Sequence, residues 1–250
     1  MFYAGLVSVS FRSLSPEEIV QAMANCGLKY VEWGSDIHAP CTDAERLDQI
    51  VALQKKHGIT CCSYGTYFRL GVTPMEELPA YIRAAKRLGT NTLRLWAGKK
   101  NSEKITPQER DEMFAQCCQA AKIAEDAGVT LCMECHNGTY TQTKEGALEL
   151  MKHVNSPAFR MYWQPNQNQP MEENMEYIRM LKPYIDHIHV FHWDGQTKCP
   201  LREGENHWKA YLTELGGDRP LLLEFMYDNQ VESLAAEAET LRSFIAACEM

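Results

Sequence analysis

The sequence predicts an α/β fold, a single (β/α)8 barrel that takes up residues 1–250 as one domain. Three observations carry this prediction. The length of 250 residues suits such a barrel. Eight short β-rich runs alternate with eight stretches of helical periodicity, and no linker or compositional break divides the chain. An open doubly wound sheet is disfavoured, because the first strand leads into residues 8–13 without a glycine-rich phosphate-binding turn.

The elements follow in strict order. We expect strands at about residues 4–11, 29–35, 59–67, 91–98, 129–136, 159–165, 185–193 and 219–226. We expect helices at Ser15–Cys26, Thr42–His57, Thr73–Leu88, Thr106–Ala127, Thr143–Val154, Met171–Leu181, Asn206–Leu215 and Val231–Cys248. A cap residue, then proline, then acidic residues begin the helices at Ser15 and Thr106. Four helices are expected to stop at a glycine: Gly27, Gly58, Gly89 and Gly128.

The net charge, the apolar runs and the cysteines of the sequence argue against several classes of function. The net charge of −8 argues against nucleic acid or an anionic membrane as the main partner, and no apolar run is long enough to span a bilayer. The first residues lack the pattern of a signal peptide. The ten cysteines include adjacent pairs and one C-x-x-C, Cys132 and Cys135, within a predicted strand. We interpret them as reduced thiols in a cytoplasmic protein rather than a disulfide framework or zinc site.

Polar residues gather where predicted strands end, which is where barrel enzymes place their chemistry. The second strand contributes Glu32 or Trp33, with Asp36 and His38 in its loop. The fourth places Arg94 and Trp96 on one face, and the fifth places Glu134 and His136 on one face. The sixth presents Gln164, the seventh His187 and His189 or, on its opposite face, His192, and the eighth Glu224.

Two of these residues indicate a cation. Glu134 and Glu224 lie in apolar strands, where a carboxylate must be paired, protonated or metal-bound to offset its desolvation. Two carboxylates converging at one mouth repel each other unless a cation lies between them. An imidazole and an amide oxygen from the intervening strands would complete a shell suited to Mn, Mg, Co or Zn. Each residue alone could equally be a paired core group; the coincidence of all four favours the metal.

At these residues the chain resembles the xylose-isomerase-like TIM-barrel superfamily of sugar phosphate isomerases and epimerases. The resemblance spans essentially the whole chain and is carried by residues 30–33 with 36–38, 133–136, 187–190, 200–205 and 223–225. It implies metal ligands at Glu134, Gln164, His189 and Glu224. The family's usual Asp is Gln164 here, which removes one negative charge, and the His often found three residues later is Gln167.

The resemblance implies an enzyme that isomerises or epimerises a small sugar or sugar phosphate through an enediolate. Glu134 and Glu224 would move the proton, and His136 would assist as acid or base. Arg202, His38, Trp33, Trp193 and Gln167 are the candidate substrate-binding residues, although Arg202 and His38 could be ordinary surface residues and the tryptophans ordinary core.

Other readings stay open. A lyase, either a dehydratase or a 3-keto-glycoside eliminase, would use the same enediolate with His136 as acid or base. A non-catalytic sugar-binding barrel is a second alternative, to which the neutral Gln164 adds weight. A DNA-repair endonuclease is disfavoured, because the charge is −8 and the ligand set is too small. The sequence leaves homo-oligomerisation open.

Overall fold

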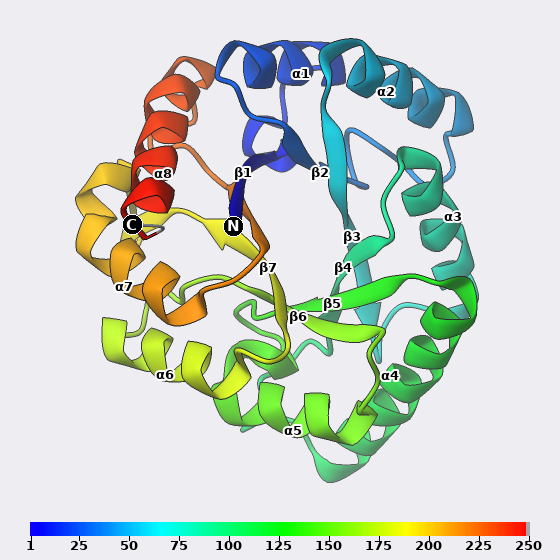
Figure 1. Cartoon of the computed structure of the whole chain (residues 1–250). Coiled ribbons are helices and arrows are strands. Elements are labelled where there is room, and N and C mark those ends of the chain that lie inside the picture. Colours follow the sequence, from blue (N-terminus) through cyan, green and yellow to red (C-terminus); the bar gives the residue numbers. More distant parts are fainter. Residues whose placement is uncertain (249–250) are drawn as a thin grey trace.

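The computed structural model describes residues 1–248, so the last two residues of the predicted domain lie outside it (Figure 1). Within this range eight parallel strands close into a barrel in the order β1-β10-β7-β6-β5-β4-β3-β2. These strands are β1 (Phe2–Val7), β2 (Tyr30–Gly34), β3 (Thr60–Leu70), β4 (Thr92–Ala97), β5 (Thr130–Glu134), β6 (Phe159–Trp163), β7 (Ile185–Val190) and β10 (Arg219–Leu223). The predicted fold class is confirmed.

A ring of helices surrounds the barrel, one after each strand (Figure 1). They are α1 (Pro16–Asn25), α2 (Ala44–His57), α3 (Leu78–Leu88), α4 (Pro107–Ala127), α5 (Lys144–Val154), α6 (Met171–Leu181), α7 (Glu205–Leu215) and α8 (Leu234–Cys248). Short 3-10 turns are η1 (Ser8–Phe11), η2 (Met75–Glu77), η3 (Tyr140–Gln142), η4 (Leu201–Gly204) and η5 (Val231–Ser233). None of the helices in residues 1–248 is long and apolar enough to cross a membrane.

Local sequence accounts for the helix ends. Ser15 and Thr106 each form a reciprocal capping box, in which the hydroxyl accepts from the backbone of a glutamate three residues later and that glutamate accepts from the cap backbone. Helices α2 and α4 end at Gly58 and Gly128, whose φ angles of 65° and 64° lie in the left-handed region that glycine adopts without strain. These predicted starts and stops are confirmed.

Four predicted boundaries are wrong, and at each of them the chain forms a 3-10 turn or a hairpin instead. The predicted strand 4–11 stops at Val7 and continues as η1. The predicted helices beginning at Thr73 and Val231 begin at Leu78 and Leu234, after the 3-10 turns η2 and η5. The predicted strand 185–193 ends at Val190, and the following residues form an antiparallel hairpin of β8 (His192–Asp194) and β9 (Thr197–Cys199).

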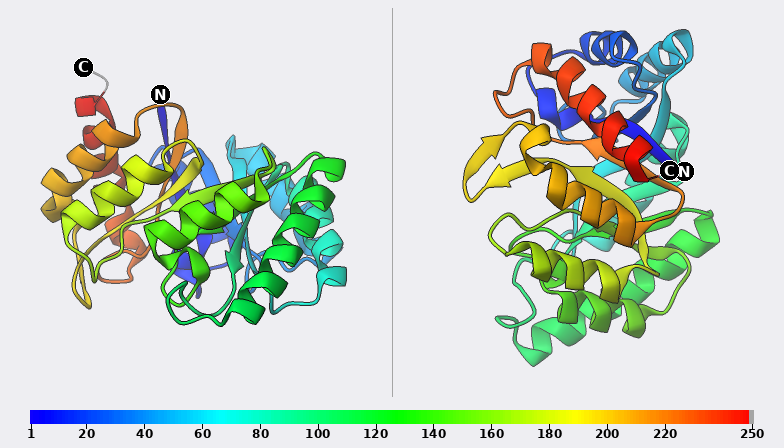
Figure 2. Two further views of the ribbon diagram at one scale, coloured as in Figure 1. Left: turned by 90° about the horizontal axis from the view of Figure 1, so that it is seen from below. Right: turned by 60° about the vertical axis from the view of Figure 1, so that its left-hand side comes forward.

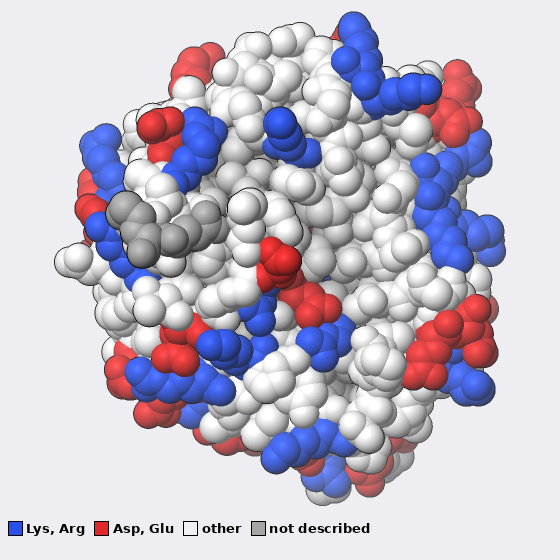
Figure 3. Space-filling model, viewed as in Figure 1, with Lys and Arg blue, Asp and Glu red and all other residues white. Residues whose placement is uncertain are grey.

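This hairpin projects from the barrel on the side opposite the two termini (Figure 2). The N-terminus begins β1, so that opposite side is the carboxyl end of the strands. On the other face, shown in Figure 3, basic and acidic residues are interspersed, and no large patch of one sign covers that face among the described residues.

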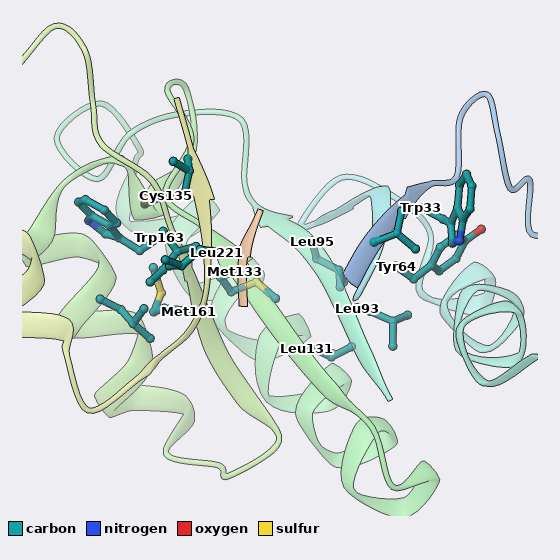
Figure 4. Close-up of a cluster of buried hydrophobic side chains, with 14 of the residues drawn as sticks. Trp33, Tyr64, Leu93, Leu95, Leu131, Met133, Cys135, Met161, Trp163 and Leu221 are labelled. Carbon is teal, nitrogen blue, oxygen red and sulfur yellow. The ribbon is translucent and has the colours of Figure 1, made fainter. Parts of the chain in front are cut away.

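Side-chain alternation along the strands separates two cores. Outward residues such as Leu93, Leu95, Leu131 and Met133 pack with the helices in a large apolar cluster, part of which Figure 4 shows. A second, small cluster, formed by Val7, Val9, Cys132, Tyr162 and Leu222, contains no residue of the α-helices and lies on the inner side of the barrel. All ten cysteines are free thiols, as expected.

Candidate functional site

The four predicted ligand positions come together at the carboxyl end of the barrel. Glu134 is the last residue of β5 and His189 lies near the end of β7. Gln164 follows β6 directly. Glu224 follows β10, and its backbone N–H extends the strand ladder by donating to the carbonyl of Val190 at 2.9 Å. Because adjacent residues of a strand point to opposite sides, the pattern that sends Leu131 and Met133 outward sends Glu134 inward.

Three oxygens converge on one nitrogen of His189. Its Nδ1 lies 3.2 Å from Gln164 Oε1, 3.4 Å from Glu224 Oε2 and 3.5 Å from Glu134 Oε1. Ligands held at about 2.1 Å from one ion in tetrahedral or octahedral directions are roughly 3.0–3.4 Å apart. The three distances from Nδ1 are therefore close to the distances between ligands of one ion.

The second carboxylate oxygen of Glu134, Oε2, makes hydrogen bonds on the side away from His189. Oε2 accepts hydrogen bonds from Arg94 Nη1 and from Trp96 Nε1, both at 2.6 Å. Arg94 also donates through Nε to Glu32 Oε1 at 2.9 Å, so its guanidinium bridges two carboxylates. All three members of this triad are at most 3% exposed.

A glycine on β3 makes room for that triad. A Cβ at Gly65 would lie 2.4 Å from Glu32 Oε1 and 2.8 Å from Arg94 Nη2, closer than real Cβ contacts allow. Position 65 therefore excludes every other residue unless the ion pair shifts. The sequence named Glu32 and Arg94 as strand-end residues but not their pairing, because alternation identifies a face and not a partner across the barrel.

The buried charges of the site do not balance by themselves. Glu32, Glu134 and Glu224 carry three negative charges when ionised, and Arg94 supplies one positive charge. With His189 neutral, two negative charges remain in a buried cluster, which is the charge that one divalent cation would neutralise. Unpaired buried charge is costly, so the cluster favours a bound cation.

The pKa shifts follow from this imbalance. Burial raises the pKa of Glu224 to about 7, with Glu134 adding in the same direction and His189 opposing. Burial would lower the pKa of His189, but Glu224 and the other carboxylates raise it to about 10. Burial would raise the pKa of Glu134, but Arg94 and His189 lower it to about 2. The protein groups by themselves thus favour a proton on His189, which offsets one of the two excess negative charges.

No three His, Cys, Asp or Glu side chains in residues 1–248 already surround a common point as a metal-binding group. Glu134 and Glu224 each contact His189, and Arg94 and Trp96 donate hydrogen bonds to the second carboxylate oxygen of Glu134. The fourth candidate is an amide, Gln164.

A cavity of about 390 Å³ opens above this cluster. Glu134, Gln164 and Glu224 contribute to its floor, and five aromatic side chains contribute to its walls. The lining residues are Val9, Arg12, Tyr67, Arg94, Trp96, Glu134, His136, Asn137, Gln164, Gln167, Phe191, Trp193, Glu224 and Phe225. This mixture of aromatic surface with a few convergent polar groups is typical of a small-molecule site.

Three predicted substrate or acid–base residues line this cavity. His136 directs Nδ1 at the carbonyl of Asn137 at 2.7 Å, and its ring centroid lies 5.3 Å from that of Trp96. Gln167 and Trp193 line the wall near Phe191. Trp193 comes from β8, so the hairpin that the sequence did not predict supplies part of the site.

The other three predicted substrate residues lie outside the cavity lining. Trp33 is fully buried on the outer side of β2, where its Nε1 donates to Gln54 of α2 at 2.8 Å; Figure 4 shows it beside Tyr64, its neighbour on β3. His38 is buried with its Nδ1 3.0 Å from Ser8 Oγ. Arg202 is an exposed residue of η4. The structure thus places Glu32, not Trp33, inside the barrel.

Arg12 and Phe225 are cavity residues that the sequence-based set of site residues did not include. Arg12 reaches the rim after η1 and pairs with Asp36 at 2.5 Å and with the hydroxyl of Tyr67. Its place directly after the first predicted strand was the available signal. Phe225 follows Glu224 with a φ of 59°, a conformation that is uncommon for a bulky residue and is found at functional sites. Nothing in the sequence marks that conformation.

Comparisons with known proteins agree with this architecture. A family model described as "Xylose isomerase-like TIM barrel" matches residues 20–245. A 3-dehydroshikimate dehydratase of Bacillus anthracis is 23% identical over 201 residues, covering 74% of this chain and 69% of that protein.

Solved structures share the fold at low identity. That of a probable 3-DHS dehydratase from Bacillus anthracis superposes with a TM-score of 0.82 at 21% identity, covering 97% of this chain and 99% of that one. A D-allulose 3-epimerase from Methylomonas sp. gives a TM-score of 0.76 at 15% identity, covering 97% and 98%. A D-psicose 3-epimerase from Clostridium cellulolyticum H10 gives 0.72 at 13%, covering 99% and 98%. With the family model matching most of its length, the chain belongs to the xylose isomerase-like TIM barrels.

Proposed function

We propose that this protein is an enzyme that binds a divalent metal ion through Glu134, Gln164, His189 and Glu224 and moves a proton next to the carbonyl group of a small sugar or sugar derivative. The observation that supports it most is the convergence of three side-chain oxygens on His189 Nδ1, beneath a cavity of about 390 Å³. The excess of two negative charges in that cluster matches the charge of the ion.

The residues fit mixed oxygen and nitrogen coordination, as for Mn, Mg, Co or Zn. The ion, when bound, supplies Lewis-acid polarisation of the substrate carbonyl and stabilises negative charge on the enediolate. Gln164 contributes an amide oxygen without charge, so the ligand set holds two carboxylates instead of three. A bound ion is then neutralised by the surrounding protein groups without excess negative charge.

Glu224 is the proposed base. Among the described residues its carboxylate has a single ion-pair partner, His189 at 3.4 Å, and in the metal-free protein burial raises its pKa to about 7. Glu134 differs, because two hydrogen bonds hold its Oε2 and its pKa is lowered to about 2. We therefore assign proton removal to Glu224 and a ligand role to Glu134.

His136 is the proposed second proton-transfer group. It lines the same cavity as Glu224 and is partly exposed to it, while its Nδ1 is engaged by the carbonyl of Asn137. Nε2 is then the nitrogen left to face a substrate. Arg12 and Gln167 at the rim, with Trp193 as an apolar wall, are the proposed substrate contacts.

Isomerisation or epimerisation is the leading reaction, with Glu224 removing the proton and either Glu224 or His136 returning it to carbon. Elimination is the second candidate, since His136 could instead protonate a departing hydroxyl group. The position of His136 in the cavity and the similarity to a 3-dehydroshikimate dehydratase favour that candidate. Both reactions begin with the same proton removal.

The experiment detects this shared step, the removal of a proton next to the carbonyl group. Purified protein is incubated in D2O with Mn²⁺ and a panel of 2-ketohexoses, 3-keto sugars and hydroxylated cyclic ketones, and deuterium incorporation and product mass are measured. We expect incorporation next to a carbonyl, with unchanged product mass for isomerisation and loss of water for elimination. Glu224→Gln should lose at least about 100-fold in rate, in the range of a removed general base.

The matched control is Glu232→Gln, an exposed carboxylate with no ion-pair partner among the described residues, which should keep the wild-type rate. Failure of every compound in the panel to exchange deuterium, despite measurable binding of ion and sugar, would support a non-catalytic sugar-binding barrel instead.

A further inference from the structure

The buried ring of His189 faces different groups with its two nitrogens. Nδ1 lies among the oxygens of Gln164, Glu224 and Glu134. Nε2 is fully buried and makes no hydrogen bond within the described residues. Its near acceptor is Glu32 Oε1 at 3.6 Å, on the opposite side of the ring from the proposed metal ligands.

Glu32 is held firmly in that position. Its Oε1 accepts from Arg94 Nε at 2.9 Å and its Oε2 accepts from Ser63 Oγ at 2.9 Å. The missing side chain at Gly65 leaves the space that Glu32 and Arg94 occupy. The carboxylate is fully buried, so water does not compete for it.

The His189 ring itself is confined. The ring of Tyr162 lies 4.4 Å from it, centroid to centroid, and the His189 side chain is fully buried. A turn of the ring that exchanged its two nitrogens would place a protonated nitrogen among the ligands and leave the other against an ionised carboxylate. A neutral imidazole binds a metal through its unprotonated nitrogen, while the other nitrogen carries the proton and needs an acceptor.

We infer that Glu32 is a positioning residue, which accepts the Nε2 proton of His189 and so presents Nδ1 to the divalent ion. This inference rests on the metal site of the proposed function. The distance of 3.6 Å exceeds a hydrogen bond, so the ring and the carboxylate approach each other by a few tenths of an ångström when the bond forms.

The first arm of the test needs neither metal nor substrate. Protein treated with EDTA and carrying ¹⁵N-labelled histidine is studied by NMR, with His189→Asn used to assign the ring. A buried, hydrogen-bonded Nε2–H gives a downfield proton signal that exchanges slowly with water. We expect this signal in the wild type and in Ser63→Ala, which keeps Glu32 Oε1 in place, and a clear shift of it in Glu32→Gln.

The second arm measures Zn²⁺ binding by calorimetry and the ¹⁵N shifts of the zinc-bound protein. We expect Nδ1 to ligate and Nε2 to stay protonated, with affinity falling about 10–100-fold in Glu32→Gln, as for other outer-shell partners, and staying close to wild type in Ser63→Ala. Should Glu32→Gln fail to fold, the wild-type ring assignment still decides the question.

Ligation through Nε2, or an Nε2–H signal unaffected by Glu32→Gln, overturns the inference. Absence of Zn²⁺ and Mn²⁺ binding in the wild type overturns the metal site of the proposed function, whereas the first arm then still reports whether Glu32 accepts the Nε2 proton.

Discussion

At the scale of single residues, the buried carboxylates of the site differ in whether a positively charged side chain neutralises them. Arg94 compensates Glu32 and Glu134 together, and it lies 3% exposed between them. Glu224 lacks a comparable partner, and the resulting imbalance is what we propose a metal ion corrects. Structural and chemical roles are thus divided between carboxylates that look equivalent in the sequence.

Replacing Arg94 with methionine should be strongly destabilising. It leaves Glu32 and Glu134 buried without their shared cation, and breaking a buried ion pair costs about 3–5 kcal/mol. Urea unfolding of the metal-free protein measures the loss. The exposed Arg87, which pairs with Asp48 on the surface, provides the control: Arg87→Met should be far less destabilising, because solvent screens an exposed ion pair. Equal losses for the two variants would contradict the special role of the buried triad.

The amide of Gln164 makes a second prediction. Gln164→Glu keeps the length of the side chain and adds a negative charge beside His189 Nδ1, so the affinity for Mn²⁺ should rise by about tenfold, or about 1.4 kcal/mol. The metal-free protein should at the same time become less stable, because a further buried carboxylate lacks a partner. Calorimetry and thermal unfolding with EDTA test both effects.

Gln167→Glu is the control for that change, since Gln167 lines the cavity without contacting His189. It should alter neither quantity strongly. Weaker metal binding in Gln164→Glu would show that the amide does not occupy a ligand position.

At the scale of elements, the ends of helices carry local stability that the sequence encodes directly. Thr106 caps α4, the 21-residue helix that follows β4. Thr106→Ala should lower the free energy of unfolding by about 1 kcal/mol, as is usual for loss of a capping hydroxyl. Thr213, within α7, bonds only the carbonyl four residues earlier, and Thr213→Ala should cost almost nothing. Similar losses in both variants would argue against the cap.

The partner in that capping box gives a pH dependence. Lys100, and then the backbone and hydroxyl of Thr106, lower the pKa of Glu109 to about 2 from its ordinary 4.5. A depressed pKa stabilises the folded state above pH 4.5 and loses that contribution as the pH falls toward 2. The stability difference between wild type and Glu109→Gln should therefore shrink from pH 6 to pH 3 in chemical unfolding experiments. A difference that is constant with pH would contradict the assignment.

The hairpin β8–β9 is an element that the sequence pattern did not predict. Residues 185–193 form an unbroken β-rich run, but the barrel ladder ends at Val190, and the chain turns to pair with itself. This turn brings Trp193 over the site, with Lys198 5.5 Å above its ring. Local propensity does not distinguish pairing within a barrel from pairing within a hairpin, because both use the same residue types.

At the scale of the whole molecule, metal binding should be linked to folding. An ion that binds only the folded barrel stabilises it by mass action, by about 2.7 kcal/mol at a concentration of 100 times Kd. Thermal unfolding after EDTA treatment should occur at a lower temperature than with Mn²⁺, and the difference should grow with Mn²⁺ concentration. The triple variant Glu134→Gln, His189→Asn, Glu224→Gln should show no such dependence. A wild-type midpoint that does not respond to Mn²⁺, Mg²⁺, Co²⁺ or Zn²⁺ would contradict the proposed cofactor.

Assembly and location stay predictions. The residues described here contain no helix that could span a membrane, and the homo-oligomeric state is open to direct measurement by light scattering.

The sequence by itself determined the eightfold alternation, the caps at Ser15 and Thr106, and the arrival of Glu134, Gln164, His189 and Glu224 at one end of the barrel. Periodicity, capping and side-chain alternation are local properties, and parallel strands necessarily bring their carboxyl ends together. Only the tertiary structure decided which carboxylates pair with Arg94 and that Glu32, not Trp33, faces His189. It also decided that Gly65 leaves space for Glu32 and Arg94. The positions of Arg12 and Phe225 at the cavity were likewise visible only in the structure. These depend on distances across the barrel and on one strained backbone angle, which no local pattern records.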